Sequence, residues 1–418
     1  MMLTRRRVLG YSALLGQGRL TSAAAQAPAP YSLAIIGNTY HYGSDLQIIA
    51  DRFLVGYQHE GDWHMPSVKV VSMYVESKPH SPADLSAARS KEFGFRVFRN
   101  IPEALRCGGA ELAVDAVLAV VEGDYPRNHK GQILYPRYDF FQQCAQVFEE
   151  EGRAVPYFNH GSLSFSFHQA QSMVATSERL KFPMLAGSSL PVTWRLPDTD
   201  IPIGAHIEEA VMVCPFDGME FDALEAMQCM LERRKGGETG VKAVQLLEGD
   251  DVWAAGDSGR WSKELLSSAL SRSDAPLGLT VMDGRPQDMA ASGVLPQLVK
   301  DPAAWCIEYN DGTRVTLLVL NGADRDFTFS ARIEGQRLIA TQFFRSPLPN
   351  VAYSASLTGK IEQMFVTRTA PYPVRRTLLT SGIMEAAMTS RTRLNQRLET
   401  PQLAVSYQPP AESQYART

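Results

Sequence analysis

The sequence has little net charge, few cysteines and no apolar run suited to a stable membrane span. Its 41 basic and 45 acidic side chains give a formal charge of −4. That balance provides no basic field for nucleic acid and argues against such a partner. The five cysteines are odd in number, and no pair has the spacing of metal ligands. We therefore expect buried free thiols, with neither a disulfide framework nor a metal site.

The first residues predict an export signal. Three arginines, Arg5 to Arg7, precede a weakly apolar run from Val8 to Ala25 that ends in three alanines. This order is typical of a secretory signal, and the paired arginines favour the twin-arginine route. Polar residues within the run make it unsuited to span a membrane. We expect residues 1–27 to be a signal peptide and the mature protein to reach the bacterial periplasm; the alternative is a disordered N-terminus.

The chain from Tyr31 to about Gly187 alternates strand and helix patterns. Strands are predicted over 33–36, 68–75, 96–98, 114–121, 155–158 and 183–186, and helices over 45–56, 82–93, 101–106, 138–151 and 166–180. The unbroken apolar run Val114–Val121 is typical of a central parallel strand that is buried on both faces. The alternation predicts an α/β fold whose first domain, residues 31–190, is a Rossmann-like parallel sheet.

The pattern changes near Ser188, where several prolines mark a crossing segment. Short, often alternating strand patterns follow over 205–214, 240–247, 304–309, 314–321, 327–333 and 340–344, with helices over 221–234 and 374–390. Asp311–Gly312 between two of these runs is a strong hairpin signal. We predict an α+β domain over 191–395 with a mostly antiparallel sheet. Residues 396–418 are predicted to be a tail, disordered after Thr400.

Short segments in this order resemble the motifs of a known family. Val97–Leu105 is similar to its "vy-x-d-x-eell" segment, and Asp115–Val117 to its "vDaV" strand. Pro183–Gly187 is similar to its "vplmvg" strand, and Tyr372–Leu379 to the start of its late helix. The chain thus resembles the Gfo/Idh/MocA oxidoreductases over nearly its whole mature length. The resemblance implies a domain for NAD or NADP, a domain for a sugar or polyol substrate, and a homo-oligomer formed through the C-terminal sheet.

The first strand–loop–helix unit departs from the family pattern. Gly37–Gly43 stands where the family has a Gly-x-Gly-x-x-Gly/Ala loop, whose glycines let the backbone approach a pyrophosphate. Tyr40 and His41 are predicted to put bulk where that approach is needed. The residues that the resemblance assigns to the cofactor are Gly37, Asn38, Thr39 and, as a ribose ligand, Glu76.

The catalytic candidate is His160. Phe158–Asn159–His160 stands where the family has its Glu-Lys-Pro motif, so the family's lysine is missing. His160 follows the strand pattern 155–158, at the carboxyl end of a parallel sheet, where open α/β folds bind ligands. Because histidine titrates near neutrality, it can replace lysine in proton transfer. The alternative is a loop histidine that is hydrogen-bonded to backbone.

Two pairs of residues could contact a sugar. Asp124 and Tyr125 follow the buried strand pattern Val114–Val121, and a carboxylate beside an aromatic ring suits sugar hydroxyls. Trp194 and Arg195 lie in the crossing segment and suit a polyol or a carboxylated sugar. The alternatives are a turn fixed by proline and a hinge fixed by packing.

A third pair lies on a predicted helix of the second domain. Glu225 and Gln228, with Glu232, fall on one helical face. In the family this helix faces the substrate and carries a histidine and an aspartate, which are replaced here. The alternative is a solvated face.

Two functions remain open on the sequence alone. The first is an exported oxidoreductase that acts on a sugar or polyol with NAD or NADP. The second is a non-redox sugar-binding protein, or a lyase or epimerase, that kept the fold and lost the cofactor. The twin-arginine signal and the Rossmann-like half favour the first, which we adopt as the prediction. The altered loop and the missing lysine favour the second, because a fold by itself does not fix a function.

Overall fold

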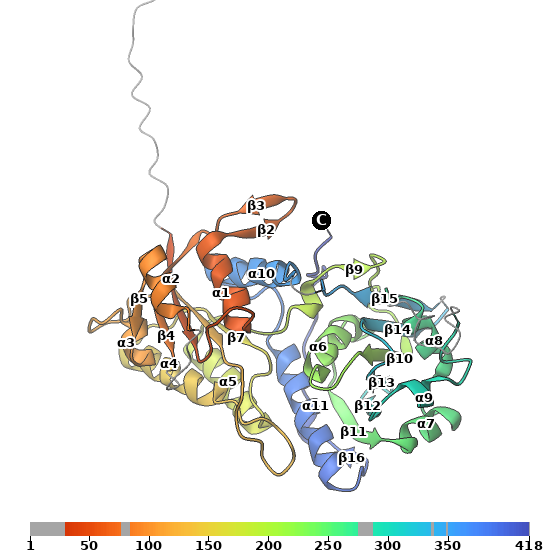
Figure 1. Ribbon diagram of the computed structural model, residues 1–418. Coiled ribbons are helices and arrows are strands. Elements are labelled where there is room, and N and C mark those ends of the chain that lie inside the picture. Colours follow the sequence, from red (N-terminus) through yellow and green to blue (C-terminus); the bar gives the residue numbers. More distant parts are fainter. Residues whose placement is uncertain (1–29, 77–83, 275–286, 336–337, 348–349, 418) are drawn as a thin grey trace, which may run out of the picture. The chain divides into compact units, whose positions relative to one another are not determined.

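The structure is a computed structural model that describes residues 30–76, 84–274, 287–335, 338–347 and 350–417. Tyr31–Thr418 form one compact unit that contains two large sheets. Figure 1 shows the two sheets and the helices that cover them.

The first sheet has six parallel strands in the order β5-β4-β1-β6-β7-β8. The strands are β1 (Tyr31–Gly37), β4 (Val68–Val75), β5 (Arg96–Phe98), β6 (Ala116–Val120), β7 (Tyr157–His160) and β8 (Met184–Gly187). This is the strand order of a doubly wound dinucleotide-binding fold, with the direction of winding reversed between β1 and β6. The predicted Rossmann-like sheet is confirmed.

Two cores lie on opposite faces of this sheet because successive side chains of a strand point to opposite sides. Ala34 and Ile36 of β1 face a core with α3 (Ile101–Leu105), α4 (Arg137–Glu151) and α5 (Phe167–Leu180). Leu33 and Ile35 face a core with α1 (Asp45–Val55). The edge is completed by α2 (Ser86–Phe93), whose predicted first residues, 82 and 83, lie outside the described residues.

A helix from the end of the chain completes the second of these cores. Helix α10 (Tyr353–Thr367) packs beside α1, with the rings of Phe53 and Phe365 6.2 Å apart. It also supports a hairpin of β2 (Tyr57–His59) and β3 (Asp62–His64), because Tyr57 donates a 2.6 Å hydrogen bond to Glu362. Neither α10 nor the hairpin was predicted.

The second sheet has eight strands in the order β16-β11-β12-β13-β10-β14-β15-β9. They are β9 (Arg195–Leu196), β10 (Ile207–Cys214), β11 (Val241–Glu248), β12 (Ala303–Tyr309), β13 (Arg314–Val319), β14 (Phe327–Ile333), β15 (Ile339–Phe343) and β16 (Leu398–Glu399). Strands β10 and β13 pair in parallel, and the other neighbours pair antiparallel. The predicted mostly antiparallel sheet and the hairpin at Asp311–Gly312 are confirmed.

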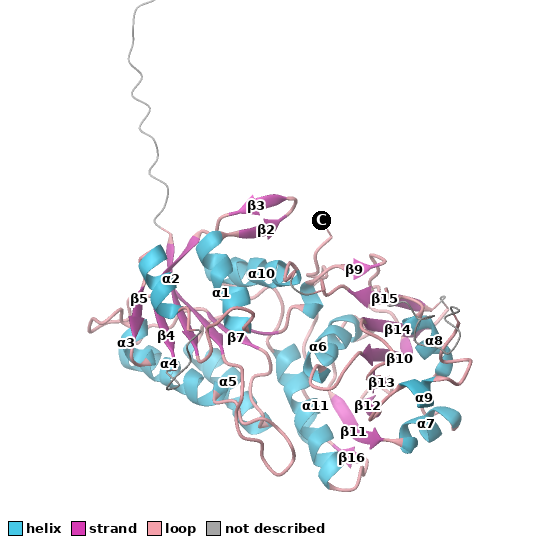
Figure 2. Ribbon diagram, viewed as in Figure 1, coloured by secondary structure: helices cyan, strands magenta, loops and turns pink. Residues whose placement is uncertain are grey.

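Helices cover both faces of the second sheet, as Figure 2 shows. One core contains Ala210 and Met212 of β10 with α6 (Glu220–Leu231) and α11 (Arg375–Thr392). The other contains Val211 and Val213 with α7 (Asp250–Asp257), α8 (Lys263–Leu270) and α9 (Leu295–Leu298). Because the first of these cores also includes side chains of the parallel sheet, α6 and α11 join the two sheets.

The last residues are ordered, so the prediction of disorder after Thr400 is wrong. The chain makes a 3₁₀ turn, η3 (Pro401–Leu403), and buries Val405, Tyr407 and Tyr415. The Tyr407 hydroxyl donates a 2.9 Å hydrogen bond to Glu232, the residue after α6. The sparse apolar residues of this segment have no periodicity of their own, and they are held by contacts with distant elements. Among the described residues, no helix is long and apolar enough to cross a membrane.

Candidate functional site

Several strands of the parallel sheet end beside one small cavity. Its volume is about 120 Å³, and the residues that line it are Asp45, His160, Ser189, Leu190, Met219, Asp222, Arg345 and Tyr353. They come from the start of α1, the end of β7, the turn η1 (Leu190–Val192), the start of α6, the segment after β15 and the start of α10. The cavity therefore combines polar side chains of both sheets at the edge where open α/β folds bind ligands.

His160 shares this cavity with two carboxylates, those of Asp45 and Asp222. Its Nδ1 is 3.7 Å from Oδ2 of Asp45, and the two side chains are 16% and 46% exposed. Burial lowers the pKa of the His160 imidazole, while the charge of Asp45 acts in the opposite direction. Burial also raises the pKa of the Asp222 carboxyl, against the charge of His160. Unlike titratable groups with displaced pKa values are typical of a site that moves protons.

Two further side chains complete the wall. The guanidinium carbon of Arg345 lies 5.5 Å from the centre of the Tyr353 ring. Burial raises the pKa of the Tyr353 hydroxyl, which therefore stays protonated. The cavity thus offers acids, a base and hydroxyl donors to a small molecule rich in hydroxyl groups.

The β1–α1 loop beside the cavity keeps one glycine of a dinucleotide-binding loop for a packing reason. A Cβ on Gly37 would lie 2.5 Å from Cδ2 of Leu46 and 3.0 Å from the carbonyl oxygen of Val120. Only glycine lets α1 approach β1 and β6 this closely. Tyr40 does not fill the place of the pyrophosphate, contrary to the prediction. It is 2% exposed and donates a hydrogen bond to Asp51 within α1.

The side chain that fills this place is Glu122, which follows β6. Its carboxylate accepts a 3.0 Å hydrogen bond from the amide of Leu46 and a second bond from the amide of Asp45. Ser44 accepts the amide of Gln47 at 3.2 Å. The first three amides of α1, which would bind a phosphate in this fold, are therefore all satisfied by the protein. Burial and the charge of Asp45 raise the pKa of Glu122 to about 7.

A chain of hydrogen bonds crosses the same crevice. The side-chain amide of Asn38 donates to the carbonyl oxygen of Glu122, and the Glu122 amide donates to Oδ1 of Asn38 at 3.0 Å. Asn38 also donates to the Tyr125 hydroxyl at 3.0 Å, and that hydroxyl donates to Glu76 at 2.6 Å. Three predicted ligands, Asn38, Glu76 and Tyr125, are thus brought together, but they bind one another.

Comparison with solved structures identifies the fold. The structure of GenD2 from gentamicin A biosynthesis, in complex with NAD, matches at a TM-score of 0.54 and 13% identity, over 93% of this chain and 99% of that one. The myo-inositol dehydrogenase of Lactobacillus casei, in complex with NAD(H) and myo-inositol, matches at a TM-score of 0.52 and 12% identity. The match covers 88% of this chain and 96% of that one. The myo-inositol 2-dehydrogenase of Lactobacillus plantarum matches at a TM-score of 0.50 and 11% identity, over 88% of this chain and 99% of that one.

The fold is the one that GenD2 and the myo-inositol dehydrogenases share. The resemblance read from the sequence is thereby confirmed at the level of the fold. No protein-family model and no curated protein matches the sequence. At 11–13% identity these likenesses establish the architecture, and the activity has to be argued from the side chains.

The remaining residues predicted to bind substrate do not line the cavity at His160. Asp124 is exposed in the loop after β6. Trp194 and Arg195 line a separate cavity beside β9. The Arg195 side chain is 1% exposed and donates to Asp200 at 2.8 Å, so its charge is already paired within the protein. Arg195 lines the cavity beside β9 together with Trp194, and its role as a ligand stays a prediction.

The sequence predicted that one face of α6 contacts the substrate or, as the alternative, the solvent. The structure contradicts both predictions. Glu225 and Gln228 are fully buried, and Glu232 is 1% exposed. Glu225 accepts a 2.6 Å hydrogen bond from Thr380. Glu232 pairs with Arg376 of α11 at 2.5 Å. The helix is enclosed between the sheet and α11, so these polar groups bind each other inside the protein.

Of the five titratable residues that line the cavity, only His160 was predicted; the other four are Asp45, Asp222, Arg345 and Tyr353. Asp45 and Asp222 lie in the first turns of their helices, where acids are common for local reasons. Their role as neighbours of His160 had no signal within either segment. Glu122 was seen only as part of a turn.

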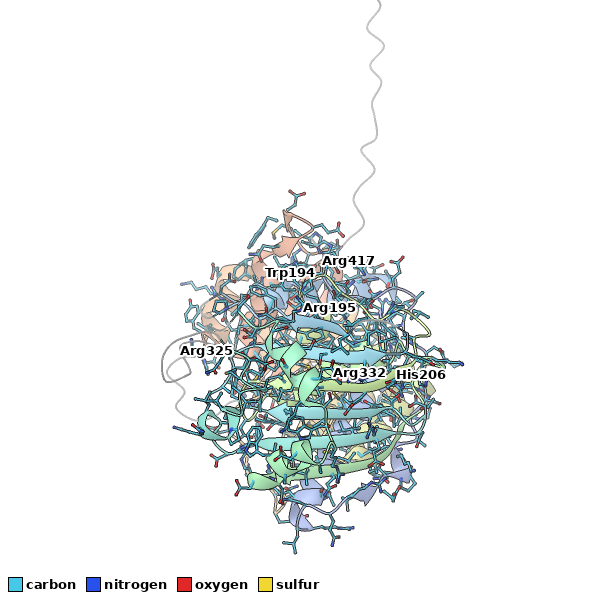
Figure 3. All side chains as sticks on the ribbon, turned by 90° about the vertical axis from the view of Figure 1, so that its right-hand side faces the viewer. Trp194, Arg195, His206, Arg325, Arg332 and Arg417 are labelled. Atoms are coloured by element: carbon cyan, nitrogen blue, oxygen red, sulfur yellow. The ribbon has the colours of Figure 1, made fainter. Side chains whose placement is uncertain are left out.

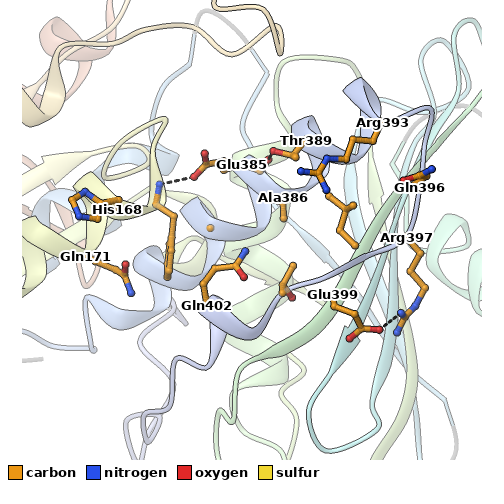
Figure 4. A pocket seen from close by; sticks show the side chains of 14 residues that line it. His168, Gln171, Glu385, Ala386, Thr389, Arg393, Gln396, Arg397, Glu399 and Gln402 are labelled. Atoms are coloured by element: carbon orange, nitrogen blue, oxygen red, sulfur yellow. Dashed lines mark hydrogen bonds and ion pairs between the residues drawn. The ribbon is translucent and has the colours of Figure 1, made fainter.

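A larger cavity of about 660 Å³ lies among α5, α11 and β16, as Figure 4 shows. Arg397 pairs there with Glu308 and Glu399, and Glu385 pairs with Lys130. Much of its charge is therefore neutralised within the protein. Among the described residues, no cluster of three or more side chains could hold a metal ion.

Proposed function

We propose that this protein binds a sugar or polyol in the cavity at His160 and acts on it as an oxidoreductase with NAD or NADP. The observation that carries the proposal is the grouping of His160, Asp45 and Asp222 at the carboxyl edge of the parallel sheet. Its fold is shared with GenD2, solved with NAD, and with an inositol dehydrogenase solved with NAD(H) and myo-inositol.

The side chains have distinct roles in this proposal. Because its pKa is lowered, the His160 imidazole is largely neutral at pH 7 and accepts a proton from a substrate hydroxyl. Asp45 stabilises the imidazolium that results, since its carboxylate is 3.7 Å from Nδ1. Asp222 and Arg345 orient other hydroxyl groups of the substrate.

The fold can bind a dinucleotide, but the groups at the start of α1 and at Glu76 that would hold it are already bound to other side chains. Bound NAD would supply the hydride acceptor. Its pyrophosphate would need the amides of Leu46 and Asp45, which Glu122 holds. Its ribose would need Glu76, which Tyr125 holds.

This mismatch favours a second candidate function, in which the protein binds or isomerises a sugar without a dinucleotide. Hydrogen bonds that close the crevice cost free energy to break, about 1 kcal/mol each and more for a charged group. In this candidate His160 still takes up a proton, and the fold is kept for its substrate cavity.

Native mass spectrometry and calorimetry separate the two candidates. The measurement is NAD and NADP binding to the full chain and to Glu122→Ala, which frees the two amides of α1. The oxidoreductase predicts a co-purifying dinucleotide, or binding that is stronger in the variant. Absence of binding in both proteins, with a polyol still bound and lost in His160→Gln, would establish the second candidate.

The export of this protein is a separate proposal that rests on Arg5–Arg7 and the weakly apolar run after them. Replacing Arg5 and Arg6 by lysine should retain the chain in the bacterial cytoplasm, as fractionation would measure. Equal periplasmic amounts of both forms would contradict the twin-arginine route.

We also propose the homo-oligomer through the C-terminal sheet that the sequence reading expected. Helices α7 and α8 already cover part of the outer face of that sheet, which limits the area left for a partner. Light scattering on the purified chain measures its mass; a monomer would contradict this proposal.

A further inference from the structure

A second cavity, of about 510 Å³, lies beside the edge strand β9 of the second sheet. The side chains that define it are Trp194, Leu196, Phe344, Ser346, Asn350 and Arg417. Figure 3 shows Trp194 and Arg417 at the same end of this sheet. Its volume is in the range of small-molecule sites in proteins.

One wall of this cavity is aromatic. The rings of Trp194 and Phe344 meet edge to face, with centroids 6.3 Å apart. Their backbones are tied together, because the amide of Phe344 donates to the carbonyl oxygen of Trp194 at 2.9 Å. Leu196 extends the apolar surface and is 43% exposed. A fixed aromatic wall that is open to solvent suits a flat ligand with an apolar face.

The polar part of the cavity contains an unsatisfied hydroxyl. Ser346 is 4% exposed, and its Oγ has no hydrogen-bond partner among the described residues. An unpaired buried hydroxyl destabilises the folded state, because it has lost its hydrogen bonds to water. Rotation about one side-chain bond lets this hydroxyl meet a ligand, which would offset that destabilisation. Other buried polar groups among the described residues also lack a partner; Ser346 Oγ and Arg195 Nε are the two whose residues line this cavity.

The charges at the rim balance. Arg417 Nε lies 3.8 Å from Oδ1 of Asp198, and both side chains are about half exposed. Asp198 also accepts a hydrogen bond from Tyr415. The rim therefore offers one acid and one base in a pair, and it favours a ligand without net charge.

We propose that this cavity binds one ring of a neutral pyranose sugar. The ring has an apolar face of C–H groups, which are attracted to the electron-rich face of Trp194. Its hydroxyl groups supply the partner that Ser346 lacks, and they reach Asn350 at the rim. A purely aromatic ligand would fill the apolar wall and leave Ser346 unpaired.

This site is distinct from the cavity at His160, although the two share a wall. Phe344 and Ser346 line the second cavity, whereas Arg345 between them lines the first. Consecutive side chains of an extended segment point to opposite sides, so the segment 344–346 separates the two cavities. Binding at one site can therefore be removed without touching the other.

Ligand-observed NMR with methyl α-D-glucopyranoside tests the proposal on the full chain. We expect Trp194→Ala to weaken binding at this site about tenfold or more, as loss of a central aromatic contact does. Trp63→Ala is the matched control, because Trp63 is 59% exposed on β3 and lies outside this cavity. Ser346→Ala should weaken binding without lowering the melting temperature, since it removes an unpaired hydroxyl. His160→Gln should leave binding at this site unchanged.

The results separate this proposal from the function proposed for His160. Equal pyranoside affinity of the wild type and Trp194→Ala would overturn the proposal of a second sugar site. Absence of binding at a pyranoside concentration of about 50 mM would also overturn it, because a specific site binds more tightly than that. Binding of phenol with no binding of the pyranoside would overturn the sugar class. If His160→Gln abolished all pyranoside binding and Trp194→Ala did not weaken it, the sugar would bind only in the cavity at His160, and the second site would be overturned. Trp194→Phe, with melting curves, distinguishes a lost contact from a misfolded protein.

Discussion

The carboxylate of Glu122 at the start of α1 makes a prediction about stability. The pKa of this group rises from 4.5 to about 7 because it is buried and lies beside Asp45. Each pKa unit corresponds to about 1.4 kcal/mol, so the ionised carboxylate costs the folded state about 3 kcal/mol relative to the unfolded chain. Hydrogen bonds from the amides of Asp45 and Leu46 offset the desolvation only in part.

The direction in which stability changes with pH follows from proton binding to Glu122. Between pH 4.5 and 7 the folded state holds a proton on Glu122 that the unfolded chain has released. The contribution of this group to stability is therefore complete below pH 4.5 and is lost as the pH rises through 7. Glu122→Gln keeps the shape and one acceptor oxygen but has no charge. We expect it to be about 2 kcal/mol more stable than the wild type at pH 8, after about 1 kcal/mol for one lost hydrogen bond.

Urea unfolding followed by tryptophan fluorescence at pH 5 and pH 8 measures the difference. The midpoint of Glu122→Gln should exceed that of the wild type at pH 8, and it should equal or fall slightly below it at pH 5. Glu111→Gln, at an exposed position, is the control and should shift neither midpoint. A variant that is destabilised equally at both values would refute the reasoning, because the carboxylate would then stabilise the folded state as an anion.

Three further predictions concern packing and buried charge. Gly37→Ala should lower the free energy of unfolding by about 1–3 kcal/mol, because its Cβ would lie 2.5 Å from Leu46; calorimetry with no loss of melting temperature would contradict this. Arg376→Met should cost about 3–5 kcal/mol by leaving Glu232 buried without its partner, and adding Glu232→Leu should restore much of the loss in urea unfolding. Deleting residues 404–417 should lower the melting temperature, since three apolar side chains there are buried; an unchanged melting curve would show that the segment adds no stability.

The fold could be predicted because its signals are local. The central strands β1, β4 and β6 of the first sheet are apolar runs, and helices such as α1 and α5 carry their own periodicity. Helix α10 was missed although its residues are apolar at helical spacing. Its place against α1 depends on Phe53, some 300 residues away in the chain. Such long-range packing has no sign within either segment.

The candidate site was predictable only in part. His160 was found because the end of a parallel strand is a recurring place for ligands. The burial of Gln228 and Arg195 was not predicted, since a polar residue on a helix or in a loop gives no indication of whether another part of the protein covers it. Here Tyr309 donates to Gln228 at 2.7 Å, and Asp200 pairs with Arg195 at 2.8 Å.

The sequence by itself determined the two-sheet architecture, the Rossmann-like class of the first sheet and the position of the loop at Gly37. It also indicated that this loop is poorly suited to bind a pyrophosphate, but it gave the bulk of Tyr40 as the reason. Only the tertiary structure decided that Tyr40 turns into the core and that Glu122, 82 residues later, takes the amides of α1. The reason is physical: backbone amides at a helix start bind whichever anion the fold brings to them, and the sequence of the loop does not specify which one.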